Sequence, residues 1–474
     1  MTENIEKMTA SRGREYRDSL RKKKILVVGM GKSGKAAVRV LHSIGAAVTA
    51  QDSSSESKID SEFVEYMREE GIGMCLGRVP DDVSEYEMLV LSPGVPTDLG
   101  FIAEARGAGA EIIGELELAY RISKCRFAAI TGTNGKTTTT TLVGEIFKAA
   151  GLSTSVVGNI GNPVVTEAYD AEDERWMVAE VSSFQLETTV YFEPVVSAIL
   201  NLTPDHLNRH KTMEAYGNAK ARIAVNQSGS EYLVVNKDDP AVMKLAQQSS
   251  AVPVLFSRTG SVEMGAYLAE KDGEQQITVR DADGRDHLIC SRGDLRIIGD
   301  HNVENALAAA AISYFAGIDP EIIGKAIREF PGVEHRIEFC ARINDVEYYN
   351  DSKGTNVDAA VIALKALKEN IILIAGGDGK SQDFTELANH LEGAVNALVL
   401  LGRDAPIIEA AARRAGFEKI YHCKDMAECV SRSAALARPG DRVLLSPACA
   451  SWDMYDNFEQ RGRHFKQCIK ELLG

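Results

Sequence analysis

A glycine-rich segment followed by a lysine and a run of threonines is the strongest chemical pattern in this sequence. The segment "TGTNGKTTTT" covers residues 131–140 and follows the apolar stretch "FAAI". A strand that ends in such a loop and enters a helix directs backbone N–H groups, the helix dipole and a lysine at one point, which suits a phosphate. Lys136 is the expected phosphate ligand, and Thr137 has the hydroxyl position that reaches magnesium in phosphate loops. The pattern predicts ATP binding, although Ile130 stands where the first glycine is usual.

Two polar residues follow neighbouring apolar segments and are candidates for a metal site. Glu180 ends "WMVAE", and His206 ends "NLTPDH" after the next apolar segment. Magnesium prefers oxygen ligands in octahedral geometry and retains several waters, so one carboxylate, one imidazole and phosphate oxygens make a workable set. A histidine in a loop is by itself more often structural. We therefore expect His206 to lie near the phosphate loop only if the fold brings the two strand ends together.

A second glycine-rich segment lies near the N-terminus. "GMGKSG" places glycines at positions 29, 31 and 34 after the apolar stretch "ILVV", and Asp52 ends the next apolar stretch. The spacing is that of a dinucleotide-binding fingerprint, with a diphosphate on the helix start and a ribose near the acid. This description fits UDP as well as NAD. The pattern alone therefore leaves an NAD-dependent oxidoreductase open.

Alternating apolar strands and helical segments must position these residues. Such alternation predicts α/β domains with mostly parallel sheets, whose ligands bind at the carboxyl ends of the strands. We expect a polar N-terminal tail at residues 1–21, then domains at 22–114, 115–331 and 332–474, with a hinge near Pro331 and Gly332. A length of 474 residues suits three domains.

Composition limits the function classes. The formal net charge of −15 argues against a general nucleic-acid binder, which needs a basic face. The eight cysteines form no C-x-x-C pair, which favours reduced thiols over a disulfide framework. The N-terminal segment has no apolar core of the signal-peptide type, and no later apolar run has the length of a membrane span. We expect a cytoplasmic protein without membrane insertion.

The order of the motifs resembles that of the Mur ligase family, the ATP-dependent amide-forming enzymes of peptidoglycan precursor assembly. After "TGTNGKTT" the sequence contains "AEVSSFQLE", "NLTPDHLNRH", "GDHNVENALAAAA", "EHRIEF", "NDSKGTN", "GGDGKSQDF" and "LLSPACASWDMYDNFEQRG" in that order. The resemblance implies a Rossmann-like UDP-binding domain, a central phosphate-loop ATPase-like domain and a Rossmann-like C-terminal domain of the dehydrogenase type. It also implies ATP as co-substrate, Mg²⁺ or Mn²⁺ as cofactor, and UDP-N-acetylmuramoyl-L-alanine and D-glutamate as the other substrates. We expect a monomer.

The resemblance assigns site residues position by position. The ATP contacts would be Gly132, Thr133, Asn134, Gly135, Lys136, Thr137, Thr138, Asn302, Asn305, Arg336 and Asp351. The contacts with the UDP-linked substrate would be Lys32, Ser33, Asp52, Ser53, Ser92, Gly94, Asn159 and Gln185. The D-glutamate contacts would be Thr355, Lys380, Ser451 and Phe458. The catalytic residues would be Lys136, His206, Lys220 and Lys353, and the metal ligands Thr137, Glu180, His206 and Lys220.

Lys220 carries a particular expectation, because the lysine at this place in the family is carbamylated by carbon dioxide. A carbamate converts a cation into an anionic oxygen ligand. The reaction requires a neutral amine, which a neighbouring metal cation and partial burial favour by lowering the lysine pKa. The sequence departs from the usual family pattern at Gly354, where alanine is common, and at Trp452, where a smaller apolar residue is common.

These residues predict ligation through an acyl phosphate. The substrate carboxylate attacks the γ-phosphorus of ATP, and the D-glutamate amine then displaces phosphate. Three alternatives stay open: a folylpolyglutamate synthetase-like or other Mur-type ligase, a phosphate-loop switch protein that binds a nucleotide and a partner, and the NAD oxidoreductase.

Overall fold

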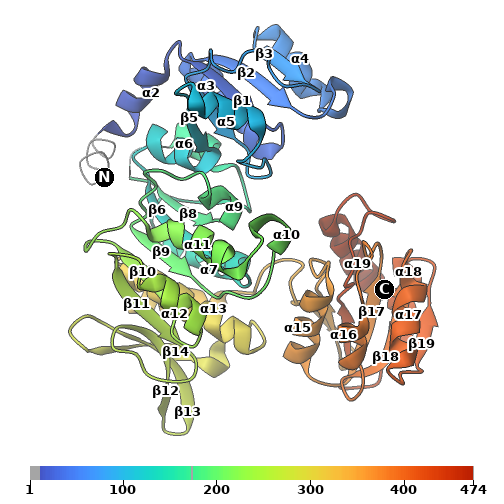
Figure 1. The fold of residues 1–474 in the computed structure, drawn as a ribbon. Coiled ribbons are helices and arrows are strands. Elements are labelled where there is room, and N and C mark those ends of the chain that lie inside the picture. The colour runs from blue at the N-terminus through green and yellow to red at the C-terminus, as the bar shows by residue number, and fades with distance from the viewer. Residues whose placement is uncertain (1–10, 172–173, 473–474) are drawn as a thin grey trace. The chain divides into compact units, whose positions relative to one another are not determined.

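The structure is a computed structural model that describes residues 11–171 and 174–472. It contains three sheets, and a helix follows most of their parallel strands, as Figure 1 shows. This architecture confirms the predicted α/β class with mostly parallel sheets. The chain divides into two compact units, one of residues up to 294 together with 304–328, and one of residues 295–303 together with 329–474.

The N-terminal domain has a five-stranded parallel sheet with the strand order β3-β2-β1-β4-β5. The central strand β1 is apolar, and its residues Ile25, Leu26 and Val27 are fully buried, as expected for a strand covered on both faces. Its elements are β1 (Lys24–Val28), α3 (Lys32–Ile44), β2 (Ala47–Asp52), α4 (Ser61–Glu69), β3 (Gly73–Leu76), β4 (Met88–Leu91), α5 (Gly100–Gly107) and β5 (Glu111–Gly114).

A short helix, α2 (Arg14–Leu20), precedes this sheet within the segment predicted to be a polar tail. Its Leu20 side chain is fully buried. Arg12 donates to the carbonyls of Tyr120 and Cys125 at 2.8 Å each, and Arg17 donates to the carbonyl of Ile122 at 2.6 Å. The described part of the segment therefore packs against residues 120–125, and residues 1–10 lie outside the described residues.

The central domain has a nine-stranded sheet with the order β14-β13-β12-β11-β10-β9-β6-β8-β7. Strands β6 to β12 are parallel, and the antiparallel strands β13 and β14 follow at one edge. The elements are α6 (Glu115–Ile122), β6 (Arg126–Thr131), α7 (Lys136–Ala149), β7 (Thr154–Gly158), α8 (Val164–Asp170), β8 (Trp176–Glu180), α9 (Ser183–Leu186), β9 (Val196–Ile199), α10 (Leu207–His210), α11 (Met213–Ala221), β10 (Tyr232–Asn236), α12 (Pro240–Ala246), β11 (Val252–Ser257), β12 (Gly265–Lys271), β13 (Glu274–Arg280), β14 (Asp286–Ser291), α13 (Asp300–Phe315) and α14 (Pro320–Glu329).

The C-terminal domain has a six-stranded sheet with the order β15-β16-β20-β17-β18-β19, in which only the edge strand β15 is antiparallel. Residues 295–303, which the predicted boundary places in the central domain, belong to the C-terminal unit, where Ile298 packs against the core. The elements are β15 (Glu338–Ile343), β16 (Val346–Asn350), α15 (Val357–Leu367), β17 (Ile371–Gly376), α16 (Thr385–Asn389), β18 (Val395–Leu401), α17 (Ala405–Arg414), β19 (Ile420–His422), α18 (Met426–Leu436), β20 (Arg442–Leu445) and α19 (Phe458–Leu472).

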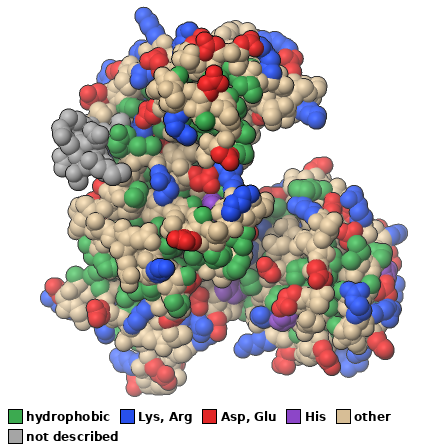
Figure 2. Space-filling model, in the orientation of Figure 1, with side chains coloured by type: hydrophobic (Ala, Val, Ile, Leu, Met, Phe, Trp, Pro, Cys, Tyr) green, Lys and Arg blue, Asp and Glu red, His purple; other side chains and the backbone are tan. Residues whose placement is uncertain are grey.

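The surface is mixed in charge. Figure 2 shows Lys and Arg side chains interspersed with Asp and Glu over the visible face. All eight cysteines are free thiols, as predicted. Among residues 11–171 and 174–472, no helix combines the length and the apolar character needed to cross a membrane.

Candidate active site

The phosphate loop joins β6 to α7 and is shaped by two glycines. Gly135 lies at the helix N-cap with φ 82°, and Gly132 has φ 154°, conformations that a side chain disfavours. Lys136 is the first helical residue, and its Nζ donates to the carbonyls of Gly132 and Thr133 at 2.9 Å each. The lysine thus lies over its own loop, where it can meet a phosphate.

Asn201 holds this loop from the neighbouring strand end, a role the sequence analysis does not predict. Its Oδ1 accepts hydrogen bonds from the backbone N–H groups of Thr133 at 3.1 Å and Asn134 at 2.8 Å, and its Nδ2 donates to the Asn134 carbonyl at 3.1 Å. The residue follows β9, which pairs with β6 in the sheet. Its position directly after an apolar strand, in "ILNLTPDH", is the signal that could have identified it.

Lys220 reaches the same loop from α11. The side chain is 1% exposed, and its Nζ donates to the Gly132 carbonyl at 2.7 Å. Burial, with the nearby charge of Lys136, lowers the pKa of Lys220 to about 7, against an opposing effect of Asp205. Much of the amine is therefore neutral near neutral pH, the state that carbamylation requires.

Glu180 lies beside the phosphate loop, because β8 pairs with β6 and places Glu180 opposite Ile130. Its side chain is buried, and Oε1 accepts a hydrogen bond from Asn159 Nδ2 at 2.8 Å. Its Oε2 is buried without a hydrogen-bond partner among the described residues. A buried carboxylate oxygen with no donor is costly. The residue therefore fits a cation at the phosphate loop.

His206 stands near these groups but remains half exposed. It is the N-cap of α10, with φ 52°, and its ring lies 4.9 Å from that of Phe184 and 6.4 Å from that of Tyr216. Tyr216 connects it with the loop, since its hydroxyl is 3.4 Å from Thr133 Oγ1 and its ring lies 4.5 Å from Lys220 Nζ. Tyr216 is buried and was not among the predicted site residues.

Asn305 of α13 contacts the phosphate loop from another direction. Its Oδ1 accepts a hydrogen bond from Thr139 Oγ1 at 3.3 Å, and a Cβ at Gly135 would lie 2.3 Å from it. Asn302 lies one turn earlier and donates to the Ile298 carbonyl at 2.7 Å within the C-terminal unit. Thr137 and Thr138, in the first turn of α7, are buried.

The first glycine loop lies between β1 and α3 and is stabilised by Asp52. Asp52 accepts hydrogen bonds from the N–H groups of Met30 and Ser54 at 2.7 Å each, and Ser92 Oγ donates to the Gly29 carbonyl at 2.7 Å. A Cβ at Gly34 would meet the Gly29 carbonyl oxygen at 1.8 Å, whereas one at Gly31 would meet nothing within 4 Å. Gly34 is thus needed for packing, while Gly31 leaves open space.

A cavity of about 410 Å³ adjoins this loop. Lys32 lines this cavity, and its Nζ donates to the Gly161 carbonyl at 2.5 Å. Gly161 is close in sequence to the predicted site residue Asn159. Ser33 lies in the first turn of α3, Ser53 is exposed after β2, and the exposed Gly94 accepts from Arg209 at 3.3 Å. Gln185 is buried and completes a capping box with Ser182, so its oxygen is occupied within α9. The cavity is lined by Met30, Gly31, Lys32, Lys35, Ala36, Arg39 and Thr166.

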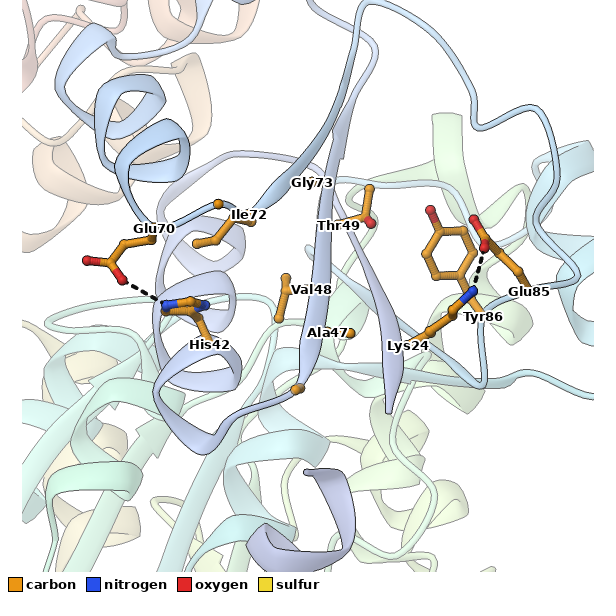
Figure 3. A pocket seen from close by; sticks show the side chains of 12 residues that line it. Lys24, His42, Ala47, Val48, Thr49, Glu70, Ile72, Gly73, Glu85 and Tyr86 are labelled. Atoms are coloured by element: carbon orange, nitrogen blue, oxygen red, sulfur yellow. Dashed lines mark hydrogen bonds and ion pairs between the residues drawn. The ribbon is translucent and has the colours of Figure 1, made fainter. Parts of the chain in front are cut away.

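A second cavity, of about 330 Å³, lies at the amino ends of the strands of the same sheet. Figure 3 shows that its charged side chains are already paired: His42 with Glu70 at 3.0 Å and Lys24 with Glu85 at 2.8 Å. Ligands of parallel sheets bind at the opposite, carboxyl ends. This cavity is therefore not a candidate for the active site.

In the C-terminal unit, Asp351 is buried at the end of β16. Burial raises its pKa to about 7, while the hydrogen bond from Ser446 at 2.6 Å and the charge of Arg336 act in the opposite direction. A Cβ at Gly354 would lie 2.5 Å from Asp351 Oδ2. An alanine at this position would therefore crowd the Asp351 carboxylate.

The residues predicted to bind the amino acid lie on three loops and at the start of α19. Lys353 Nζ lies 5.7 Å from the ring of Phe458, and the carbonyl of Phe458 accepts from Ser352 Oγ at 2.8 Å. Thr355 lies two residues after Lys353 and is partly buried. Ser451, in the loop after β20, is buried, and Lys380, in the loop after β17, is exposed.

Arg461, which was not predicted from the sequence as a site residue, links two of these loops through hydrogen bonds. It is 2% exposed and donates to Ser352 Oγ at 3.0 Å, to the Ser352 carbonyl at 2.8 Å and to the Cys449 carbonyl at 3.0 Å. Burial lowers its pKa to about 10. An arginine within "NFEQRG", three residues after the predicted Phe458, was the available signal.

Glu334, His335 and Glu338 form another group with metal-ligand spacing. The ammonium of Lys466 lies 2.6 Å from Glu334 and 2.9 Å from Glu338. The cluster thus already contains its cation and has the character of an ionic contact within the domain.

Comparisons with known proteins agree with this geometry. The family model of the Mur ligase MurD-like N-terminal domain matches residues 23–114, that of the Mur ligase middle domain residues 130–313, and that of the Mur ligase glutamate ligase domain residues 335–449. The UDP-N-acetylmuramoylalanine–D-glutamate ligase of Alkaliphilus metalliredigens is 45% identical over 456 residues, 96% of this chain and 99% of the relative. That of Clostridioides difficile is 46% identical over 454 residues, again 96% and 99%.

Solved structures show the same fold at lower identity. UDP-N-acetylmuramate-alanine ligase MurC from Thermotoga maritima has a TM-score of 0.59 at 22% identity, covering 95% of this chain and 99% of its own. A pseudomurein peptide ligase type C from Methanothermus fervidus has a TM-score of 0.54 at 21% identity, covering 95% and 100%. The three matched domains and the full-length relatives establish that this chain belongs to the Mur ligase family.

Proposed function

We propose that this protein is an ATP-dependent ligase that adds D-glutamate to UDP-N-acetylmuramoyl-L-alanine in the cytoplasm. The observation that carries the proposal is the convergence of Lys136, Lys220 and the incompletely paired Glu180 on one phosphate loop. Relatives that carry this activity in their names match nearly the whole chain at 45–46% identity. This match favours the D-glutamate ligase over the other Mur-type ligases and over a folylpolyglutamate synthetase.

The chemistry follows from the charges at this loop. The L-alanine carboxylate attacks the γ-phosphorus and releases ADP, and the D-glutamate amine then attacks the acyl phosphate and displaces inorganic phosphate. Lys136 would stabilise the charge on the transferred phosphoryl group, and the backbone N–H groups at the start of α7 would hold the phosphates in line. A protein nucleophile is not required.

Magnesium is the proposed cofactor. Glu180, Thr137, His206 and a carbamylated Lys220 would hold it, and when bound it would neutralise charge on the phosphate oxygens. Glu180 supports this assignment because its buried Oε2 has no donor among the described residues. Lys220 supports it because its lowered pKa favours the neutral amine that reacts with carbon dioxide.

The other substrates are assigned to the neighbouring domains. The UDP end would lie at the first glycine loop, near Lys32, Ser33, Asp52, Ser53, Ser92 and Gly94, with Asn159 and Gln185 on the central domain. D-glutamate would contact Thr355, Lys380, Ser451 and Phe458, with Lys353 near the reacting centre. We propose that the enzyme acts as a monomer.

An omission assay tests the function. Purified protein is incubated with ATP, Mg²⁺, UDP-N-acetylmuramoyl-L-alanine and D-glutamate, and phosphate release and product mass are measured with each component left out in turn. We expect phosphate release only in the complete mixture, and a product heavier than the UDP-substrate by one glutamyl residue. Turnover without the UDP-substrate, with a pteridine substrate or with a nicotinamide cofactor would contradict the proposal.

A further inference from the structure

Among the described residues, Trp452 is the most exposed large apolar residue, and a lysine lies beside it. Its side chain is 64% exposed. The Nζ atom of Lys380 lies over its ring, 4.0 Å from the centroid. A cation at this distance from an indole face is attracted by the ring quadrupole. The pair therefore has a defined geometry even though both residues face solvent.

The backbone brings these two residues together. Asp378 and Ala450 form an isolated antiparallel bridge, with hydrogen bonds of 2.9 and 2.8 Å between their backbone groups. Lys380 and Ser381 follow with φ of 50° and 63°, a left-handed conformation that is uncommon without glycine. Strained backbone of this kind persists where surrounding contacts hold it, and it is concentrated at binding sites.

Among the described residues, no carboxylate pairs with the ammonium group of Lys380. In the described parts of the chain, no salt bridge to Lys380 is found, and the nearby Asp378 accepts from the Lys380 backbone N–H at 3.1 Å and pairs with Arg403 at 3.2 Å. The recorded partner of the ammonium is the neutral indole. Such a contact orients a cation and leaves its charge available to an anion.

We propose that Trp452 is a positioning residue for the amino-acid substrate. Its indole holds the Lys380 ammonium in place, so that a substrate carboxylate can bind the lysine without displacing a competing acid. This inference rests on the proposed function, because Lys380 is assigned there to D-glutamate.

Steady-state kinetics test the role. In Trp452→Leu, which keeps an apolar side chain without a π face, we expect the KM for D-glutamate to rise about two- to five-fold, the range of a cation–π contact at an exposed site. The kcat and the KM values for ATP and the UDP-substrate should stay unchanged. Trp452→Phe should restore most of the affinity for D-glutamate. Met454→Leu, at an exposed residue of the same loop, is the matched control.

Fluorescence gives a second readout that does not depend on turnover. The chain has two tryptophans, and Trp176 is buried in the central domain. We expect Lys380→Met to change the emission of the wild-type protein, and the same substitution in a Trp452→Phe background to have no effect. An unchanged emission spectrum in Lys380→Met would overturn the pairing.

The kinetic outcomes separate this inference from the function itself. If the wild-type protein ligates D-glutamate but Trp452→Leu keeps the wild-type KM, the inference is wrong and the function stands. If Trp452→Leu raises all three KM values equally, the residue is merely structural. If the wild-type protein does not consume D-glutamate, the proposed function fails, and the assignment of Trp452 fails with it.

Discussion

The two glycine loops of this protein share a backbone plan and differ in what surrounds them. Each follows a parallel strand and begins a helix, with Gly31 and Gly135 as the N-caps. In the first loop, Asp52 accepts from two backbone N–H groups, so the acid stabilises the loop. In the second, Glu180 keeps one oxygen unpaired among the described residues and two lysines contact the Gly132 carbonyl.

A glycine loop therefore predicts an anion-binding site, but it does not identify the reaction. Helix N-termini attract phosphate wherever they occur. Phosphoryl transfer additionally requires cations at the transferred group. The first loop therefore suits a diphosphate that is only bound, and the second suits one that reacts. Six substitutions test this difference.

The largest effect is expected at Lys136. Lys136→Ala removes the cation that lies over the phosphate loop, and turnover should fall by about 10²-fold or more, as when one transition-state donor is lost. Phosphate release under saturating substrates measures it. Lys148→Ala, on the exposed side of the same helix, should keep normal turnover. Near-normal ligation by Lys136→Ala would remove the distinction between the loops.

Lys220 tests whether the second loop uses a carbamate. Lys220→Met should lower turnover about 10- to 100-fold, as for the loss of a group that supports a metal site. Lys244→Met, an exposed lysine of α12, is the control. Added ¹³C-bicarbonate should give a carbamate NMR signal in the wild-type protein and not in Lys220→Met. A fully active Lys220→Met would contradict the proposal.

The lowered pKa of Lys220 also predicts a pH dependence. At pH values below about 7 the amine is protonated and cannot form a carbamate, so turnover should rise as the pH increases through about 7. Without carbon dioxide, the folded-state pKa lies below the ordinary value of 10.5. The unfolded chain then binds more protons between these values, so stability should rise with pH across that window.

Glu180→Gln tests whether Glu180 holds a cation, in contrast to Asp52, which stabilises its loop. Glutamine can still accept the hydrogen bond from Asn159, but it lacks the negative charge that would hold a cation. We expect the Mg²⁺ concentration for half-maximal turnover to rise about tenfold, at the low end of the effects seen around metal sites. A magnesium titration measures it. Glu145→Gln, an exposed residue of α7, should leave the titration unchanged.

Two glycines of the first loop should behave differently. Gly34→Ala places a Cβ 1.8 Å from the Gly29 carbonyl oxygen and should destabilise the protein by about 1–3 kcal/mol, as overpacking does. Gly31→Ala meets no neighbour within 4 Å and should unfold at the wild-type denaturant concentration, while raising the KM for the UDP-substrate. Equal stability of the two variants would contradict the packing described for this loop.

The smallest effect is expected far from both loops. Arg12→Ala removes two hydrogen bonds to the carbonyls of Tyr120 and Cys125 and should cost about 1 kcal/mol of stability. Denaturant unfolding measures it, with the exposed Arg14→Ala as the control. Loss of ligation without loss of stability would instead give the N-terminal segment a role in the reaction.

Local sequence patterns predicted the α/β class, the three domains and the phosphate loop, because strand, glycine turn, lysine and helix are local features. The ends of β6, β8 and β9 could be identified from the same local pattern, which is why Glu180 was predicted. Trp452 and Gly354 were noticed only as departures from a family pattern.

Tertiary structure alone decided which side chains meet. Asn201 and Tyr216 hold the phosphate loop from distant segments, Arg461 joins two loops from beneath, and helix α2 forms within a segment whose composition reads as a polar tail. The lowered pKa of Lys220 likewise arises from burial. Contacts between residues far apart in the chain, and the exclusion of water around them, follow from the packing of whole elements, which no local pattern of residues encodes.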